Sequence, residues 1–282
     1  MEQWLVMSNC QTVGLANCIQ AQTPEVAVAA LDPAMFKARP MRLNARMGKF
    51  DKLLIYPGIR PEVRKAKLER IATHVELPIV TFRAYHPDLI YIFHRGRPLS
   101  GPLSHYHSAI AFACHRKGLT IADAQGYFNG TFYEACGYLD LWASERDRLL
   151  AEFDACGLDI RARFRDWGRE RAFMYSYNHP RIGPLYDMAS ALLSLAGLEP
   201  RRSDLTPQDN LASSAIFAVY PEIGEALGVP GSYEFRTVGD YRPMVLREYL
   251  ARCYALYDGI PATNLTPFPE FCNQVDRISD LL

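Results

Sequence analysis

The stretch LVMSNCQTVG, residues 5–14, places an apolar run directly before an Asn-Cys-Gln triplet and a glycine. WLVMS (4–8) is typical of a buried strand, and TVGLANCIQAQ (12–22) has the apolar spacing of a helix. Cys10 is therefore expected in the turn that joins the first strand to the first helix. A thiol at this position is explained either by a buried structural cysteine or by a nucleophile.

The first third of the chain alternates strand-like and helical patterns. Three further strands are predicted at 25–31, 52–58 and 77–85, with a helix at 61–75 that opens on a proline. Alternation of this kind predicts a small parallel sheet with helices on both faces.

From about residue 100 the pattern becomes mainly helical. Helices are predicted at 103–118, 136–157, 181–197 and 241–259, and Gly118, Gly157 and Gly197 are expected to end three of them. The Pro-rich segments 200–210 and 261–270 are predicted to be surface connections. We expect one domain over 1–282, with an α/β core in 1–100 and a helix-rich C-terminal elaboration in 101–282.

The 282 residues carry 31 basic and 31 acidic side chains, so net charge gives no argument for binding nucleic acid or a membrane. Residues 34–70, however, hold eleven Lys/Arg against three acids, a local charge of +8. Such a surface on a neutral protein favours a phosphorylated small molecule, and a solvated helix face is the alternative.

Cysteine use and the apolar runs indicate the compartment. The seven cysteines are odd in number, widely spaced and without a CxxC pair, which disfavours disulfides and zinc and fits reduced thiols. The N-terminus lacks the basic region of a signal peptide, and no apolar run approaches the roughly 20 residues that span a bilayer. A cytoplasmic protein without a transmembrane segment is expected.

Cys10 is the first candidate catalytic residue, because active sites of open α/β sheets lie beyond the carboxyl ends of the strands. The start of a helix there would favour the thiolate, which is the nucleophilic form. Asn9 and Gln11 offer amide donors for an oxyanion, and Gly14 permits close backbone approach.

His179 is the candidate general base. It lies in FMYSYNHPRIG, where Asn178 and Pro180 fix a turn after an aromatic run and before a helix.

The segment YHPD (85–88) follows the strand predicted at 77–85. Asp88 is a candidate to orient a histidine, and a plain turn explains the same segment equally well. The candidate substrate contacts are Tyr85, His86, His105 and His107.

Several segments together resemble the WcbI-type capsular polysaccharide biosynthesis acetyltransferases. They are SNCQTVGLA, LLIYPGIRPE, LPIVTFRAYHPD and GRERAFMYSYNHPRIGPLYDMASALLSLAG, in that order over about residues 4–197. Ser8 stands where the family usually has glycine. The resemblance implies coenzyme A binding, O-acetylation of a bacterial capsule sugar such as a deoxyheptose, and a fold similar to the SGNH hydrolases.

In that larger fold a serine takes the place of Cys10, a late histidine acts as base, and an acid lies three residues before it. Ser176 occupies that position here, so Asp88 is the remaining candidate for the acid. The resemblance implies that Cys10 either forms an acyl-enzyme or only lines the site, while His179 deprotonates the sugar hydroxyl.

Coenzyme A carries three phosphate groups, for which basic side chains are the expected contacts. The candidates are Arg60, Arg64, Lys65, Lys67, Arg95 and Arg97. The partners implied are acetyl-CoA, a sugar or glycan acceptor and other capsule-synthesis enzymes, without nucleic acid or metal. An acyl hydrolase and a non-catalytic coenzyme A-binding scaffold are the alternatives.

Overall fold

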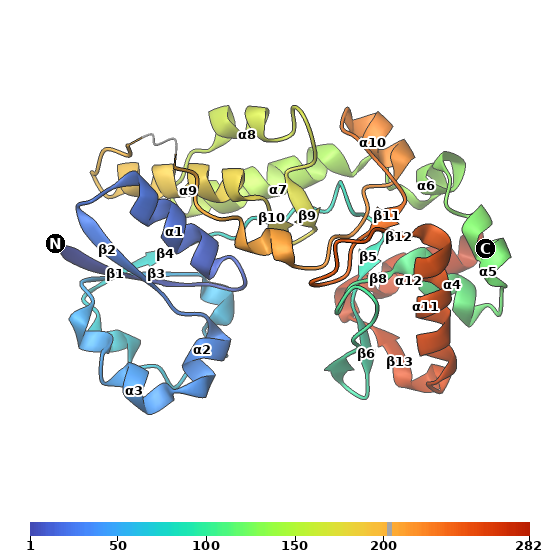
Figure 1. The fold of residues 1–282 in the computed structure, drawn as a ribbon, viewed down its shortest axis with the longest axis horizontal. Coiled ribbons are helices and arrows are strands. Elements are labelled where there is room, and N and C mark those ends of the chain that lie inside the picture. The colour runs from blue at the N-terminus through green and yellow to red at the C-terminus, as the bar shows by residue number, and fades with distance from the viewer. Residues whose placement is uncertain (202–204) are drawn as a thin grey trace. The chain divides into compact units, whose positions relative to one another are not determined.

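The computed structural model describes residues 1–201 and 205–282, and Figure 1 labels its elements. The chain forms two compact units, each assembled from three segments. The first unit comprises Met1–Thr81, Asp147–Gly168 and His179–Leu211, and the second comprises Phe82–Arg146, Arg169–Asn178 and Ala212–Leu282. The expected single domain over 1–282 stays a prediction. Across the described residues, no helix combines the length and apolarity that a membrane span requires.

A four-stranded sheet of order β2-β1-β3-β4 organises the first unit. All its pairings are parallel, and Val6 of β1 lies opposite Ala30 of β2 and Leu54 of β3. The predicted parallel α/β sheet is therefore confirmed. The elements of this unit are β1 (Glu2–Met7), α1 (Thr12–Gln22), β2 (Val26–Ala30), α2 (Pro33–Ala38), α3 (Pro40–Asn44), β3 (Lys52–Ile55), β4 (Thr73–Glu76), α8 (Arg161–Trp167), β10 (His179–Pro180) and α9 (Ile182–Leu195), with 3-10 turns at Met47–Lys49, Pro57–Ile59 and Leu68–Arg70.

Both faces of the sheet are covered, because side chains alternate along each strand. Leu5 and Met7 of β1 pack into a cluster with Phe36 and Met47, which brings α2 and the following turn over one face. Helix α1 contacts β1 and β2 as well as α9. Figure 1 shows α1 and α9 on one side of β1 and β3, and α2 and α3 on the other.

Two elements predicted in the first third of the chain are wrong. The span 61–75 contains turns, the 3-10 turn Leu68–Arg70 and the start of β4 in place of a helix. Its apolar spacing reflects single buried anchors such as Val63 and Ile71. The span 77–85 has no strand, although most of it is buried. Pro78 lacks the N–H that a ladder needs, so apolar composition here signals burial without pairing.

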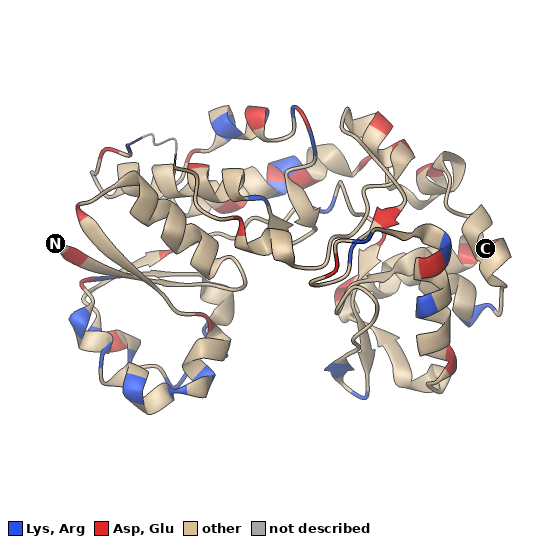
Figure 2. Ribbon diagram, in the orientation of Figure 1, with Lys and Arg blue, Asp and Glu red and all other residues tan. Residues whose placement is uncertain are grey.

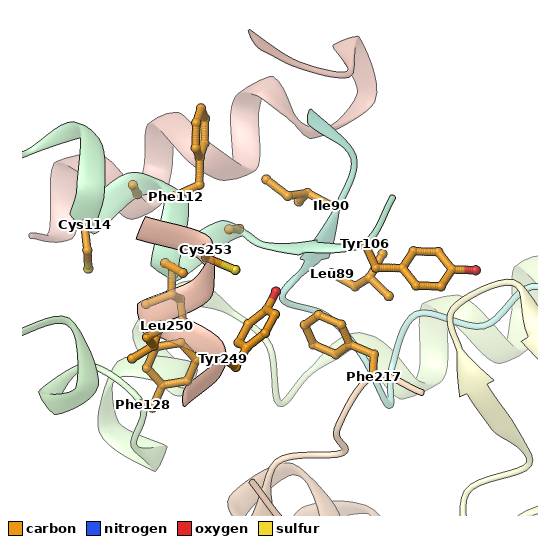
Figure 3. Close-up of a cluster of buried hydrophobic side chains, with 14 of the residues drawn as sticks. Leu89, Ile90, Tyr106, Phe112, Cys114, Phe128, Phe217, Tyr249, Leu250 and Cys253 are labelled. Atoms are coloured by element: carbon orange, nitrogen blue, oxygen red, sulfur yellow. The ribbon is translucent and has the colours of Figure 1, made fainter. Parts of the chain in front are cut away.

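The second unit surrounds a larger aromatic core. Helix α4 packs against α11 and α12, and Figure 3 shows side chains of α4 and α11 beside Leu89 and Ile90 of β5. The elements are β5 (Leu89–Ile90), β6 (Ile92–His94), β7 (Arg97–Pro98), β8 (His107–Ser108), α4 (Ala109–Arg116), α5 (Ile121–Gly126), α6 (Gly130–Cys136), β9 (Met174–Ser176), α10 (Pro221–Leu227), β11 (Glu234–Phe235), β12 (Met244–Val245), α11 (Leu246–Asp258), β13 (Leu265–Pro267) and α12 (Cys272–Leu281), with 3-10 turns at Ala262–Asn264 and Pro269–Phe271. Helix α7 (Leu141–Ala155) begins in the second unit and ends in the first. The 3-10 turn Asn210–Ser213 begins in the first unit and ends in the second.

The later helices are confirmed with shorter bounds, as α4, α7, α9 and α11. Gly118, Gly157 and Gly197 follow three of them with φ of 72°, 74° and 77°, the left-handed conformation that ends a helix without a Cβ penalty. The connection predicted at 261–270 is wrong in part, because Leu265 is buried and β13 pairs with β6. The connection predicted at 200–210 includes residues 202–204, which lie outside the described residues.

Candidate active site

Cys10 lies in the turn between β1 and α1, as predicted. Thr12 fixes this turn, since its Oγ1 donates to the Asn9 carbonyl at 2.7 Å and accepts the Ser8 N–H at 2.9 Å. The Asn9 Oδ1 accepts the N–H of Gln11 at 3.0 Å. These bonds hold the backbone on both sides of Cys10, whose side chain is exposed.

The side chain of Gln11 has a structural role in place of the predicted oxyanion contact. Its Nε2 donates to the Val80 carbonyl at 2.8 Å, and the Val80 N–H donates to its Oε1 at 3.1 Å. Gln11 is buried and both ends of its amide are engaged. This pair ties the chain beyond β4 to the Cys10 turn.

Backbone groups replace Gln11 as candidate donors to an oxyanion. The first turn of a helix leaves its N–H groups without intrahelical acceptors. Within residues 1–201 and 205–282, the N–H groups of Val13 and Gly14 have no hydrogen-bond acceptor. Both belong to the first turn of α1, immediately after Cys10.

The thiol of Cys10 is not held as a thiolate. Part of its side chain reaches solvent, but protein atoms surround the sulfur closely enough for desolvation to raise its pKa to about 11. Its own N–H acts in the opposite direction and only partly offsets this rise. The expected thiolate at the helix start is therefore wrong, and Cys10 must lose its proton as it reacts.

The close packing of α1 against α9 brings Cys10 and His179 toward the same end of two helices. A Cβ added at Gly14 would lie 2.8 Å from Leu185 Cδ1 and 3.8 Å from Ile182 Cδ1, so only glycine allows this approach. At the far end of α1, the Gln22 Nε2 donates to the Tyr186 carbonyl at 2.8 Å. The Oε1 of Gln22 also accepts the Ser190 hydroxyl at 2.6 Å. The contacts thus advance from Ile182 to Ser190 along α9 as they advance from Gly14 to Gln22 along α1, so the two N-termini lie together.

Chain length then bounds how far apart the two candidates can be. Cys10 precedes Gly14 by four residues, and His179 precedes Ile182 by three. A chain spans at most about 3.6 Å per residue, so each side chain starts within roughly 15 Å of the same helix contact.

His179 is half-buried, and burial lowers its pKa to about 4. The imidazole is therefore neutral at pH 7 and able to accept a proton. The neighbouring Asn178 belongs to the second unit, where its Oδ1 accepts the Tyr106 hydroxyl at 2.7 Å and its Nδ2 donates to the Tyr91 hydroxyl at 3.1 Å. Both ends of the Asn178 amide are therefore bonded, and its predicted supporting role is limited to fixing the backbone next to His179.

Asp209 is an acid at the start of α9 that the sequence reasoning missed. Its Oδ2 accepts the N–H of Ile182 at 3.0 Å, which places the carboxylate at the first residue of α9. It follows α9 by a long connection in the chain, and no local motif marks it. Only the tertiary structure brings it to this helix start.

Asp88 does not orient a histidine in this structure. It is fully buried in the second unit, where its Oδ1 accepts the Ile110 N–H at 2.9 Å and the Tyr138 hydroxyl at 3.0 Å. Its Oδ2 accepts the Tyr220 hydroxyl at 2.7 Å. Burial raises its pKa to about 6, and its hydrogen bonds, including one to Ser108, oppose that rise.

The two residues that open the YHPD segment are also buried. Tyr85 packs edge-on against Trp142 and Phe173, and His86 lies edge-on to Phe217. Neither side chain is exposed by more than 1% of its surface. Their predicted substrate contacts would require the core to open.

The two remaining histidine candidates differ in exposure. His107 is buried, with Nδ1 at 2.9 Å from the Tyr257 hydroxyl and Nε2 at 3.1 Å from the Leu99 carbonyl. Burial lowers its pKa to about 4, so it is a neutral structural histidine. His105 is exposed, and its predicted contact with substrate stays a prediction.

The basic candidates for coenzyme A are exposed and divided between the units. Arg60 forms an ion pair with Glu76 at 3.2 Å, whereas Arg64, Lys65 and Lys67 have no ion pair among the described residues. In the second unit, Arg95 and Arg97 belong to the β6–β7 hairpin, where Arg95 has a positive φ of 52°.

Comparisons with known proteins agree on one family. A family profile described as polysaccharide biosynthesis enzyme WcbI matches residues 3–201. A solved structure of a protein described as "WcbI, a novel polysaccharide biosynthesis enzyme" is similar, with a TM-score of 0.70 and 14% identity, covering 99% of this chain and 95% of that one. Its description specifies a native form without a disulfide bond between coenzyme A and a cysteine. No curated protein matches the chain.

Proposed function

The chain belongs to the WcbI family of polysaccharide biosynthesis enzymes, and we propose that it is an O-acetyltransferase that moves the acetyl group of acetyl-CoA to a sugar of a bacterial capsular polysaccharide. The shared N-terminal end of α1 and α9 supports this proposal, because Cys10 precedes one of these helices and His179 precedes the other. The description of the solved relative names coenzyme A and a cysteine, in a form without a disulfide bond between them. This supports a coenzyme A ligand, and we propose acetyl-CoA as the donor.

In the proposed first step the thiol of Cys10 attacks the acetyl carbonyl. His179 takes the thiol proton as the new C–S bond forms, because the pKa of about 11 leaves almost no thiolate at pH 7. The C–S bond to coenzyme A breaks, and its sulfur receives the proton from His179. The free N–H groups of Val13 and Gly14 and the side chain of Asn9 are the proposed donors to the oxyanion.

In the second step the sugar hydroxyl attacks the acetyl-cysteine. His179 takes the hydroxyl proton and returns it to the Cys10 sulfur as the acetyl group leaves. The carboxylate of Asp209 is proposed as the acid that the sequence lacks at Ser176. If the carboxylate reaches the imidazole during the reaction, it would stabilise the imidazolium and raise the pKa of His179, which burial lowers.

Exposed basic side chains are proposed to hold the phosphates of coenzyme A. These are Arg60, Arg64 and Lys65 of the first unit. The candidates Arg95 and Arg97 of the second unit stay predictions. The cytoplasm is the proposed location of the reaction, since reduced cysteines and acetyl-CoA both belong there.

Calorimetric titration with coenzyme A and acetyl-CoA tests the donor. Saturable binding at one site is expected, and Arg64→Glu should weaken it about tenfold, since a charge-assisted phosphate contact is worth about 1.5–3 kcal/mol. Glu222→Gln, a change in an acid of α10, is the matched control and should bind as the wild type does. Absence of binding at millimolar ligand would contradict the proposal.

An acyl esterase is the second candidate, because the exposure of Cys10 allows water to act as the acceptor. Turnover of p-nitrophenyl acetate without a sugar, lost in Cys10→Ala, would favour it. Dependence of acetyl-CoA consumption on an added glycan acceptor would favour the transferase.

A further inference from the structure

The residues below the sheet of the first unit form a feature that we name the basic lobe, comprising residues 33–50 and 60–70. Asn44 joins its two segments, since its Nδ2 donates to the Lys65 carbonyl at 2.9 Å and its Oδ1 accepts the Lys67 N–H at 2.8 Å. Phe36 and Met47 anchor the lobe in the core beneath the sheet. The lobe is therefore one folded surface.

The charge of this lobe is almost entirely positive. Residues 33–50 contain five basic residues and no acid. Among the ten basic residues of the lobe, ion pairs join only Lys37 to Glu62 and Arg60 to Glu76. The other eight are exposed and have no ion pair within the described parts of the chain: Arg39, Arg42, Arg46, Lys49, Arg64, Lys65, Lys67 and Arg70. Figure 2 shows these basic positions recurring around α2 and α3.

The two acids that flank residues 33–50 in the sequence bond to backbone N–H groups. Asp32 accepts the Met35 N–H at 2.7 Å and caps α2, while Asp51 accepts the Gln3 N–H at 2.8 Å beside the sheet. Glu69 is the one acid of the lobe itself that has no ion pair in the described residues. The ten basic residues of the lobe exceed its two acids, Glu62 and Glu69, by eight, so the net charge of the lobe is strongly positive.

Two large apolar side chains of the same segment are exposed as well. Met41 of α3 is 87% exposed and Met35 of α2 is 47% exposed. Unbranched methionine adapts readily to an irregular apolar surface. A phosphate ligand or a nucleic acid would use the charges and leave both methionines in water.

We propose that the basic lobe binds the surface of an anionic lipid bilayer, with Met35 and Met41 inserted at the boundary between headgroups and acyl chains. Each Lys or Arg near such a surface contributes about 1 kcal/mol, and inserted apolar side chains add to this attraction. The lobe would hold the enzyme at the membrane by its surface alone. The lobe shares Arg60, Arg64 and Lys65 with the proposed coenzyme A contacts, but the membrane proposal is tested on Arg39, Arg42 and Arg46, which are not proposed to touch coenzyme A. It can therefore fail without the acetyltransferase proposal failing.

Sedimentation of the full chain with vesicles tests the proposal. Vesicles of phosphatidylcholine with one third phosphatidylglycerol should bind the protein, more weakly as salt is raised, and pure phosphatidylcholine should not. The triple variant Arg39→Glu, Arg42→Glu, Arg46→Glu should bind at least about 100-fold more weakly, as three lost contacts of this strength predict.

A second triple variant controls for net charge. Lys117→Glu, Arg165→Glu, Arg171→Glu changes exposed residues outside the lobe by the same charge and should bind vesicles as the wild type does. Equal losses in the two triple variants would overturn the proposal. Circular dichroism melting verifies that each variant is folded.

The methionines separate a bilayer from other anions. Met35→Ser with Met41→Ser keeps every charge and should weaken vesicle binding about tenfold, while leaving coenzyme A binding unchanged. Vesicle binding that is insensitive to this change would overturn the proposal, and so would tighter binding to duplex DNA than to vesicles of equal charge.

Discussion

The turn around Cys10 and the network around Asp88 illustrate two fates of similar sequence patterns. Both sequences place polar residues after an apolar run, in SNCQT and AYHPD. In the first, Thr12 and Asn9 satisfy the turn locally, and Cys10 stays exposed. In the second, Asp88 is fully buried and accepts bonds from Ile110, Tyr138 and Tyr220. Polar residues after an apolar segment therefore indicate a catalytic site only when the reactive atom of one of them is exposed and not used in structural hydrogen bonds.

Cys10→Ala is expected to distinguish the functional Cys10 turn from the structural Asp88 network most clearly. We expect a loss of about 1000-fold or more in acetyl transfer, because the nucleophile is removed, with an unchanged melting temperature for an exposed side chain. Cys18→Ala is the matched control, since Cys18 is fully buried in α1. It should lower the melting temperature and leave the turnover of folded protein intact. A loss of less than tenfold in Cys10→Ala would instead indicate direct transfer.

Asp88→Asn should show the opposite pattern. The amide offers one acceptor oxygen where the carboxylate has two, so a buried donor loses its partner at a cost of about 1–3 kcal/mol in unfolding free energy. Turnover of the folded protein should be unchanged. Chemical denaturation and acetyl transfer, measured on the same samples, check both statements.

The difference in unfolding free energy between the wild type and Asp88→Asn should also depend on pH. The pKa of Asp88 rises from 3.8 to about 6 on folding, so the folded state takes up a proton more readily than the unfolded state. The stability contributed by Asp88 is therefore greatest below about pH 4 and declines as the pH rises through 6. The amide of the Asp88→Asn variant does not titrate, and the stability gap between wild type and variant should narrow over this interval. A gap that widens would mean that folding lowers the pKa of Asp88. Folding lowers the pKa of His107, so this histidine changes stability with pH in the opposite direction. It is present in both the wild type and the variant, and its effect cancels in their stability difference.

The smallest effect is expected from Gly14→Ala, which tests the contact between α1 and α9. The added methyl group would lie 2.8 Å from Leu185 Cδ1, so the leucine must shift at a cost of about 1–2 kcal/mol. Leu185→Ala in the same protein removes the clash, and the double variant should be more stable than the sum of the single effects predicts. Additive effects would show that the two helices are not in contact at this point.

Local patterns accounted for much of the fold. The first three strands, α1 and the four long later helices follow from apolar periodicity, and three glycines correctly marked helix ends. The predictions at 61–75 and 77–85 failed because isolated buried residues such as Val63 and Val80 imitate a periodic element. Burial and pairing are separate properties, and a single sequence reports burial more directly.

The sequence by itself determined that Cys10 ends a strand and begins a helix, and that His179 precedes another helix. Only the tertiary structure decided that α1 and α9 share an N-terminal end, that Gln11 is committed to Val80, and that Asp209 caps α9. It also decided that Asp88 and His107 are core residues. The physical reason is that hydrogen-bond partners and desolvation depend on residues far away in the chain, whereas strand and helix periodicity is local.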